Sequence, residues 1–216
     1  MSRARGQQQP IVVVLGEDDN DRQVVCILVS ALRPELPKGS LKPLRKPMAL
    51  VRKVPPDRIP SQTSRVSAVL RAQAVRFPIR AVLMHEDADD VEPAHQALIK
   101  KVEDAFRPLP WPVLAVVPAW ETEAWWFLFP EAVRAVHRSW RLPDQYTGKD
   151  VGKIRNAKEQ LSKAVRPAGV RANFRSYEVS DSPRVAEEIV AQRLLSQPPA
   201  ARSASWQVFL DKVKMI

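Results

Sequence analysis

The chain has 216 residues, of which 45% are hydrophobic and 27% are charged, and its formal net charge is +10. This composition is close to that of globular proteins and excludes a wholly disordered chain, while the length suits one main domain with an extension. Cys26 is the single cysteine, which excludes an internal disulfide and a zinc site built from several thiolates.

The N-terminal residues MSRARGQQQP are polar and basic. They lack the apolar stretch of a secretory signal. No uncharged apolar run in the chain approaches the roughly 20 residues needed to cross a bilayer. We therefore expect a cytoplasmic protein that does not act in a membrane.

The positive charge is concentrated in one part of the chain. Residues 33–80 contain 12 Lys or Arg and 2 acids, whereas the remaining residues contain 22 of each sign. A localised basic surface is typical of a protein that binds a polyanion, because Lys and Arg that neutralise phosphates release condensed counterions. A solvated face without a partner is the alternative. The candidates for nucleic-acid contacts in this segment are Arg45, Lys46, Arg52 and Lys53.

Strands and helices are predicted to alternate in the first part of the chain. The apolar run IVVVL at residues 11–15 predicts a buried strand, and a helix capped by Asp19 or Asn20 follows until Pro34 ends it. A basic, Pro-rich insertion at 34–62 comes next, and a short strand is expected around residues 48–54. Further helices are predicted at 64–75 and from Pro93, and further strands at 78–84 and 110–118.

The last third of the chain is predicted to be mainly helical. Residues 121–126 open one helix, and further helices are expected at 149–165 and 183–195. Trp206, Phe209, Leu210 and Val213 are spaced for a final amphipathic helix that packs back on the core. The expected domain organisation is a flexible N-terminus at 1–10, a catalytic core at 11–130, and a helical C-terminal extension at 131–216.

Acidic residues follow each of the three predicted strands. They are four carboxylates in GEDDND at 16–21, the run HEDADD at 85–90, and Glu121 with Glu123. Alternating strands and helices imply a parallel sheet with right-handed crossovers, and such sheets bind ligands beyond the carboxyl ends of their strands. We therefore expect the three acidic groups to meet at one edge of the sheet.

Convergent carboxylates need a compensating cation, because two like charges about 4 Å apart repel by roughly 4 kcal/mol at an effective dielectric of 20. Carboxylates without His or Cys select hard ions, with Mg²⁺ or Mn²⁺ favoured beside phosphates. A pair of such ions activates water and stabilises the leaving oxygen in phosphodiester cleavage. His85 is interpreted as a bystander, Trp125 and Trp126 as core residues, and Asp19, Glu86 and Asp90 as capping or solvated acids.

These residues resemble a known family. A Glu after the first strand, Glu17, and an Asp-x-Asp after a later one, Asp87-Ala88-Asp89, look like the Toprim fold of topoisomerases, primases and overcoming-lysogenisation-defect nucleases. The resemblance narrows to a small bacterial Toprim-like family, a domain of unknown function associated with ATPases in phage-defence loci. Its pattern is E-G-x-T-E, then D-x-D, then E-x-E-A-W, and later K-x-x-L, a Tyr and an aromatic-Phe-Leu box. The corresponding residues here are Glu17 to Asp21, Asp87 to Asp89, Glu121 to Trp125, Lys158 to Leu161, Tyr177, and Trp206 to Leu210.

The resemblance implies a Toprim-like (Rossmann-like) α/β core, in which a central parallel sheet is flanked by helices, plus the mainly helical extension. It implies a Mg²⁺- or Mn²⁺-dependent nuclease that cleaves DNA or RNA, transfer RNA included, as the effector of an anti-phage system with an ATPase partner. The implied catalytic residues are Glu17, Asp87 and Asp89. The implied metal ligands are Glu17, Asp21, Asp87, Asp89, Glu121 and Glu123, and Lys158 is a candidate phosphate contact. The first motif departs from the family: Asp18 replaces its Gly, Asn20 its Thr and Asp21 its second Glu.

Two other functions remain open. In the first, a non-catalytic module holds a structural ion, or none, and its basic segment docks onto nucleic acid or a partner protein. In the second, the acids after the first strand form the Mg²⁺ pocket of a receiver-like signalling domain. That family has a lone Asp about 40 residues later, whereas the next strand-end acids here come 70 residues after Glu17.

Overall fold

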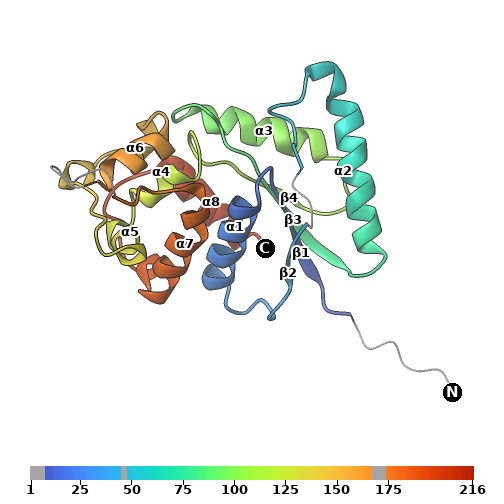
Figure 1. Cartoon of the computed structure of the whole chain (residues 1–216). Coiled ribbons are helices and arrows are strands. Elements are labelled where there is room, and N and C mark those ends of the chain that lie inside the picture. The colour runs from blue at the N-terminus through green and yellow to red at the C-terminus, as the bar shows by residue number, and fades with distance from the viewer. Residues whose placement is uncertain (1–7, 45–47, 167–173) are drawn as a thin grey trace.

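A computed structural model describes residues 8–44, 48–166 and 174–216 (Figure 1). Within them, one sheet contains β1 (Ile11–Leu15), β2 (Leu41–Pro43), β3 (Ile79–His85) and β4 (Val113–Val116). The strand order is β2-β1-β3-β4 and every pairing is parallel, so the predicted α/β class and parallel sheet are confirmed. Most of the predicted N-terminal segment, and the candidates Arg45 and Lys46, lie outside the described residues.

Most residues of β1, β3 and β4 are buried, on both faces of the sheet, whereas β2 is largely exposed. Along β1, Val12 and Val14 belong to one apolar cluster, whereas Ile11, Val13 and Leu15 belong to a second cluster on the opposite side. Successive strand residues point to opposite faces, so an unbroken apolar run is what a sheet covered by helices on both sides requires.

Helix α1 (Asp19–Leu32) begins directly behind β1. Its N-cap is Asp18, whose side chain accepts a hydrogen bond from the backbone N–H of Asn20 at 2.6 Å, so the predicted caps, Asp19 and Asn20, are wrong by one or two residues. Asp19 and Asp21 lie in the first turn, where acids are stabilised by the helix dipole. The helix ends just before Pro34, as predicted.

Helices cover the two faces of the sheet (Figure 1). α2 (Ile59–Ala74) and α3 (Ala94–Phe106) lie on one side, and α1 with α7 (Ser182–Ala191) on the other. α2 begins five residues earlier than predicted. Pro60 lies in its first turn, where a proline costs no hydrogen bond, and the hydroxyls of Ser61 and Thr63 donate to the carbonyls of Arg58 and Ile59 instead of capping the helix.

The C-terminal part contains α4 (Glu123–Trp126), α5 (Pro130–Val136), α6 (Ala157–Ala164), α7 and α8 (Ala204–Lys214). Trp125, Trp126, Phe209 and Val213 share one apolar cluster with Val12 of β1. Trp125 and Trp126 are therefore core residues, as predicted. The helix predicted at 149–165 is confirmed only in its second half. In the first half the N–H of Val151 donates to the carbonyl of Arg202 at 2.8 Å, and Asn156 adopts a left-handed conformation directly before α6.

The strand predicted around residues 48–54 is wrong. The strand that pairs with the outer side of β1 is β2, and residues 48–54 form an irregular segment. The reason is a buried carboxylate: Oε1 of Glu86 accepts the N–H groups of Leu50, Val51 and Arg52 at 3.2, 2.8 and 2.9 Å. Those donors are then not free for a sheet ladder.

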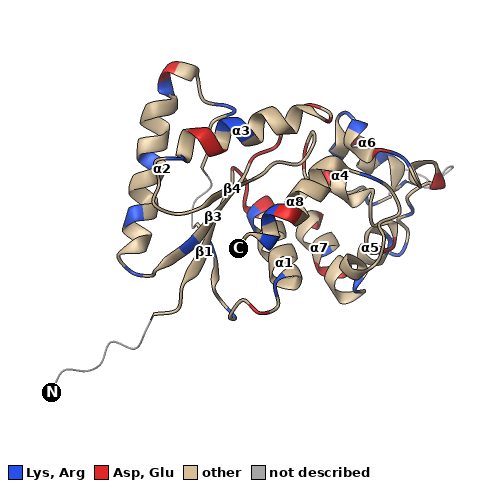
Figure 2. Ribbon diagram, turned by 180° about the vertical axis from the view of Figure 1, so that it is seen from behind, with Lys and Arg blue, Asp and Glu red and all other residues tan. Residues whose placement is uncertain are grey.

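Basic positions recur along α2 (Figure 2), which contains Arg65 and Arg71 and no acid. Across the three described stretches of the chain, no helix combines the length and the apolar character that crossing a membrane requires.

Candidate functional site

The three acidic groups meet at the carboxyl ends of β1, β3 and β4. β1 and β3 are neighbours in the sheet, but the chain passes from β1 to the edge strand β2 before it returns to β3. The order of the strands therefore reverses between β1 and β3, which is where open α/β sheets bind ligands. Glu17 and Asp21 follow β1 at this point, and Asp87 follows β3.

Backbone pairing continues past the ends of β3 and β4 and aligns the second and third acidic groups. The N–H groups of Glu86, Ala88 and Asp89 donate to the carbonyls of Val116, Pro118 and Trp120 at 3.1, 3.2 and 2.8 Å. The N–H of Trp120 donates back to the carbonyl of Asp90 at 2.7 Å. The segment that carries Asp87 and Asp89 is thus fixed beside the one that leads to Glu121 and Glu123.

Two residues of this paired segment adopt left-handed backbone conformations. The φ angles are +49° for Asp89 and +58° for Trp120. The conformation is uncommon for a residue with a side chain, although Asp adopts it more readily than Trp. Here it lets the two segments exchange hydrogen bonds while both turn away from the sheet.

Asp87 is the central acid of the group. Its Oδ1 atom is buried and accepts no hydrogen bond from the described residues. Burial raises the pKa of Asp87 well above its usual range, and the negative charges of Asp21, Glu123, Glu121 and Asp89 raise it further. Four other carboxylates therefore act on one buried oxygen that has no donor of its own.

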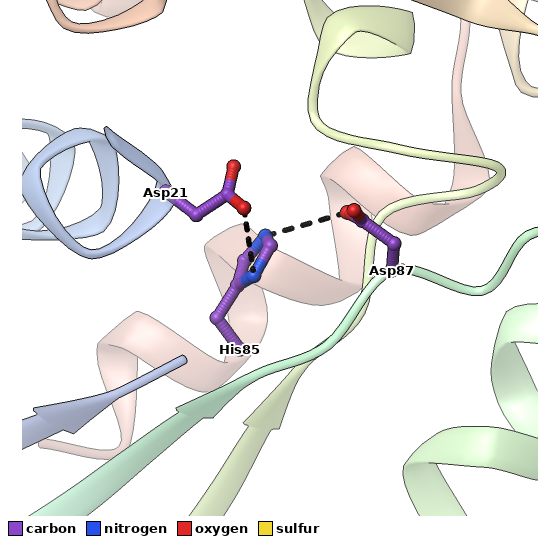
Figure 3. Close-up of side chains that lie close together, drawn as sticks. All are labelled: Asp21, His85 and Asp87. Carbon is purple, nitrogen blue, oxygen red and sulfur yellow. Dashed lines mark ion pairs between the residues drawn. The ribbon is translucent and has the colours of Figure 1, made fainter. Parts of the chain in front are cut away.

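Asp21 is oriented by Thr122 and His85. The Thr122 hydroxyl donates to Oδ1 of Asp21 at 2.8 Å, and Thr122 Oγ1 lies 2.9 Å from Nε2 of His85. The imidazole lies between the two carboxylates, with Nδ1 at 3.8 Å from Oδ2 of Asp21 and Nε2 at 3.8 Å from Oδ1 of Asp87 (Figure 3). All three side chains point toward one another from α1, the end of β3 and the loop behind it.

Glu121 and Glu123 approach from the end of β4. Oε1 of Glu123 accepts a hydrogen bond from the Tyr177 hydroxyl at 2.9 Å, and burial, followed by the charge of Glu121, raises the pKa of Glu123 to about 7. Oε1 of Glu121 accepts the backbone N–H of Lys158 at 2.7 Å in the first turn of α6, and burial again raises the pKa of this carboxyl. Lys158 meets the site through its backbone, since its ammonium lies 3.9 Å from Glu159.

Glu17 and Asp89 lie on the outer side of the group and are paired with cations. Oε2 of Glu17 forms an ion pair with Nζ of Lys53 and lies 3.7 Å from Nη2 of Arg52. Nη1 of Arg52 forms an ion pair with Oδ2 of Asp89. Two predicted nucleic-acid contacts, Arg52 and Lys53, therefore reach the acidic site itself, although Oε1 of Glu17 remains buried without a hydrogen-bond partner among the described residues.

The other acids of the opening motif have structural partners. Asp18, the residue that departs from the resembled pattern, caps α1. Asp19 forms an ion pair with Arg22, and that buried guanidinium donates to the carbonyls of Asp18 and Leu44. Asp18 and Asp19 thus stabilise the start of α1, which carries Asp21 into the site.

Sequence reasoning missed four contributors to the site. Glu86 was interpreted as a capping or solvated acid but is fully buried, and His85 was interpreted as a bystander but lies between Asp21 and Asp87. Thr122 lies between Glu121 and Glu123 in the third motif, and this position could have predicted that its side chain lies near the acids. Tyr177 had no signal apart from the late Tyr of the family pattern, because 54 residues separate it from Glu123.

Comparisons of the chain with protein-family models, with curated proteins and with solved structures found no match.

Proposed function

We propose that the chain is a metal-dependent nuclease of the Toprim class that hydrolyses phosphodiester bonds in DNA or RNA. The observation that carries this proposal is Asp87. Its buried Oδ1 accepts no hydrogen bond from the described residues, and burial, followed by the charges of four other carboxylates, raises the pKa of Asp87. Such an arrangement is costly unless a cation compensates it.

The donor set fits a divalent ion. It consists mainly of carboxylate oxygens, which Mg²⁺ and Mn²⁺ prefer, and Oδ1 of Asp87 has capacity for a ligand. The candidate ligands belong to the three strand-end groups: Glu17, Asp21, Asp87, Asp89, Glu121 and Glu123. Glu17 and Asp89 already pair with Arg52 and Lys53, so the residues that would hold the ion are first Asp21, Asp87, Glu121 and Glu123. When bound, a divalent ion would activate a water molecule and stabilise the charge on the reacting phosphate.

The chain's own residues supply the rest of the chemistry. The oxygen of a water bonds to phosphorus, the bond from phosphorus to one bridging oxygen breaks, and a proton goes to the leaving oxygen. Glu17 is placed to move that proton, since its Oε1 has no hydrogen-bond partner among the described residues. Arg52 and Lys53 lie beside it and would orient the phosphate by charge-assisted hydrogen bonds.

The biological setting rests on the family resemblance alone. It implies the effector of an anti-phage system with an ATPase partner, and it leaves DNA, RNA and transfer RNA as candidate substrates. The proposed cytoplasmic location rests instead on the polar N-terminal residues and on the lack of a long apolar run. The basic segment at 33–80 supports a polyanionic partner.

Cleavage assays test the proposal. The purified chain, alone and with any ATPase encoded beside it, is incubated with labelled DNA, RNA and transfer RNA in Mg²⁺, in Mn²⁺ and in EDTA. We expect metal-dependent cleavage that both Glu17→Ala and Asp87→Ala abolish, while Asp90→Ala, a change at an exposed neighbour, retains it. Full cleavage by either of the first two variants would contradict the assignment. Loss of cleavage supports it when the variant unfolds at a temperature close to that of the parent.

One observation favours a non-catalytic module as the second candidate. Arg52 and Lys53 neutralise Glu17 and Asp89 from within the chain, so the outer acids do not need an ion. Binding of nucleic acid without cleavage, with the partner ATPase present and in every metal, would support this candidate.

A further inference from the structure

The acids of the site fall into two groups that are compensated in different ways. The outer group, Glu17 and Asp89, forms ion pairs with Arg52 and Lys53. The inner group contains Asp21, Asp87, Glu121 and Glu123. Among the described residues, no Lys or Arg side chain forms an ion pair with a member of the inner group. Its charged or polar neighbours are His85, Thr122, Tyr177 and Lys158, which donates its backbone N–H to Glu121 and whose positive charge partly offsets the rise in the pKa of that carboxyl.

Arg52 is a fixed cation. Its own N–H and those of Leu50 and Val51 donate to the buried Oε1 of Glu86, and the Leu50 and Val51 side chains are fully buried. The main chain at residue 52 is therefore anchored both by hydrogen bonds and by apolar packing. From this anchor the guanidinium, only 18% exposed, lies between Asp89 and Glu17. It takes the position that a second metal ion would need in order to bind those two acids.

In the inner group, the hydrogen bonds of Thr122 determine which ring nitrogen of His85 is free to bind an ion. Thr122 has one hydroxyl proton and donates it to Asp21, so the 2.9 Å contact between Thr122 Oγ1 and Nε2 of His85 requires Nε2 to be the donor. In the neutral imidazole Nδ1 then carries the lone pair, and it lies 3.8 Å from Oδ2 of Asp21. His85 is 1% exposed and points into the cluster (Figure 3). Oδ1 of Asp87 faces the same ring at 3.8 Å from Nε2, and one candidate ligand atom from each of Asp21, His85 and Asp87 lies within 4.8 Å of the other two.

We propose that the site binds one divalent ion, at Asp21, His85 and Asp87 with Glu123 beside them, and that Arg52 replaces a second ion between Glu17 and Asp89. This inference rests on the proposed metal dependence and narrows it. Imidazole nitrogen is a ligand for transition metals, whereas Mg²⁺ prefers oxygen alone. The inner site therefore binds Mn²⁺ more tightly than Mg²⁺.

The test measures Mn²⁺ binding to the full chain without nucleic acid, by calorimetry and by the electron paramagnetic resonance of free Mn²⁺. We expect one Mn²⁺ per chain in the parent protein. Asp21→Asn and Asp87→Asn should weaken binding by about tenfold or more, whereas Glu17→Gln and the exposed control Asp90→Asn should change it by less than about threefold. Arg52→Gln should bind a second Mn²⁺.

Each opposite result overturns a stated part of the proposal. Absence of Mn²⁺ binding, two ions in the parent protein, or loss of the ion in Glu17→Gln would overturn the inner site. A single ion in Arg52→Gln would overturn the role of Arg52. Cleavage in the assay above combined with two bound ions would contradict this inference but not the proposed nuclease function. One bound ion without cleavage would contradict the proposed nuclease function but not this inference.

A spectroscopic measurement makes the test independent of how well the variants fold. Pulsed electron paramagnetic resonance of Mn²⁺ bound to the parent protein detects a coordinated ¹⁴N nucleus. We expect that signal, and we expect His85→Gln to remove it while His137→Gln, in the C-terminal part, retains it. A bound ion without a nitrogen ligand would exclude His85 from the site.

Discussion

Burial and mutual repulsion govern the inner carboxylates at the scale of single residues. The pKa of Glu123 rises from its ordinary value of 4.5 to about 7, first because the group is buried and then because Glu121 is charged. Between these two pKa values the folded state binds more protons than the unfolded state. The free energy of unfolding therefore falls as the pH rises through this interval.

Glu123→Gln should remove this pH dependence from the metal-free protein. A shift from 4.5 to about 7 corresponds to about 3 kcal/mol, so the variant should gain stability relative to the parent between pH 5 and pH 8. Urea unfolding in EDTA at several pH values measures the difference. His95, whose pKa is lowered by burial, acts with the opposite sign in both proteins and cancels in the comparison. Parallel curves for the two proteins would contradict the prediction.

At the scale of elements, buried acids attach segments that are distant in sequence. Oε2 of Glu92 accepts the N–H of Ala204 at 3.0 Å, and its Oε1 accepts the N–H of Ser205 and the hydroxyl of Ser203, both at 2.8 Å. Glu92 thus caps α8 from more than 100 residues away. The fit is tight at Gly152, where an added Cβ would lie 2.0 Å from Cδ of Glu92.

Glu92→Ala should lower the free energy of unfolding by about 2–4 kcal/mol, because it leaves the first N–H groups of α8 without an acceptor. α8 carries Trp206, which packs edge-on against Trp125 with ring centroids 5.2 Å apart, so near-ultraviolet circular dichroism should change as well. Glu131→Ala is the matched control, since that exposed acid lies in the first turn of α5 and has no hydrogen-bond or ion-pair partner among the described residues. Its cost should stay below about 0.5 kcal/mol. Equal losses in the two variants would refute the capping role.

At the scale of the whole molecule, part of the basic segment lies against the acids at the carboxyl ends of the strands. The basic segment at 33–80 carries the excess positive charge, and its residues Arg52 and Lys53 reach the acids at the ends of the strands. Lys53 is 57% exposed and remains accessible to a phosphate, whereas Arg52 is largely covered.

Lys53→Gln should reduce the salt dependence of nucleic-acid binding. If Lys53 contacts one phosphate, the slope of log K against log salt concentration should fall in magnitude by about 1, as measured with a fluorescent oligonucleotide between 50 and 200 mM salt. Lys214→Gln serves as the control. The neighbouring residue, Val213, accepts a hydrogen bond at 2.7 Å from Arg33, which follows the last residue of α1. Lys214 is therefore near the end of α1 that is opposite Asp21 and the site. An unchanged slope in Lys53→Gln would assign this residue to the internal ion pair with Glu17 alone.

Local patterns predicted the elements well where apolar periodicity dominates and poorly where a distant side chain intervenes. β1, β3 and β4 follow from their apolar runs, and α3 follows from Leu98 and Val102 on one face. The strand expected at 48–54 does not form, because Glu86, 34 to 36 residues away, takes its backbone donors. The role of Asp18 is explained only by the structure, in which it caps α1.

The amino-acid sequence by itself determined that three acidic groups meet at one edge of a parallel sheet, because alternating strands and helices bring the carboxyl ends of the strands together. The tertiary structure alone decided which cation or hydrogen-bond donor each of these acids contacts. Lys53 lies 36 residues from Glu17, Arg52 lies 37 from Asp89, and Thr122 lies 101 from Asp21. No local pattern encodes contacts over such separations, since they depend on how whole segments pack.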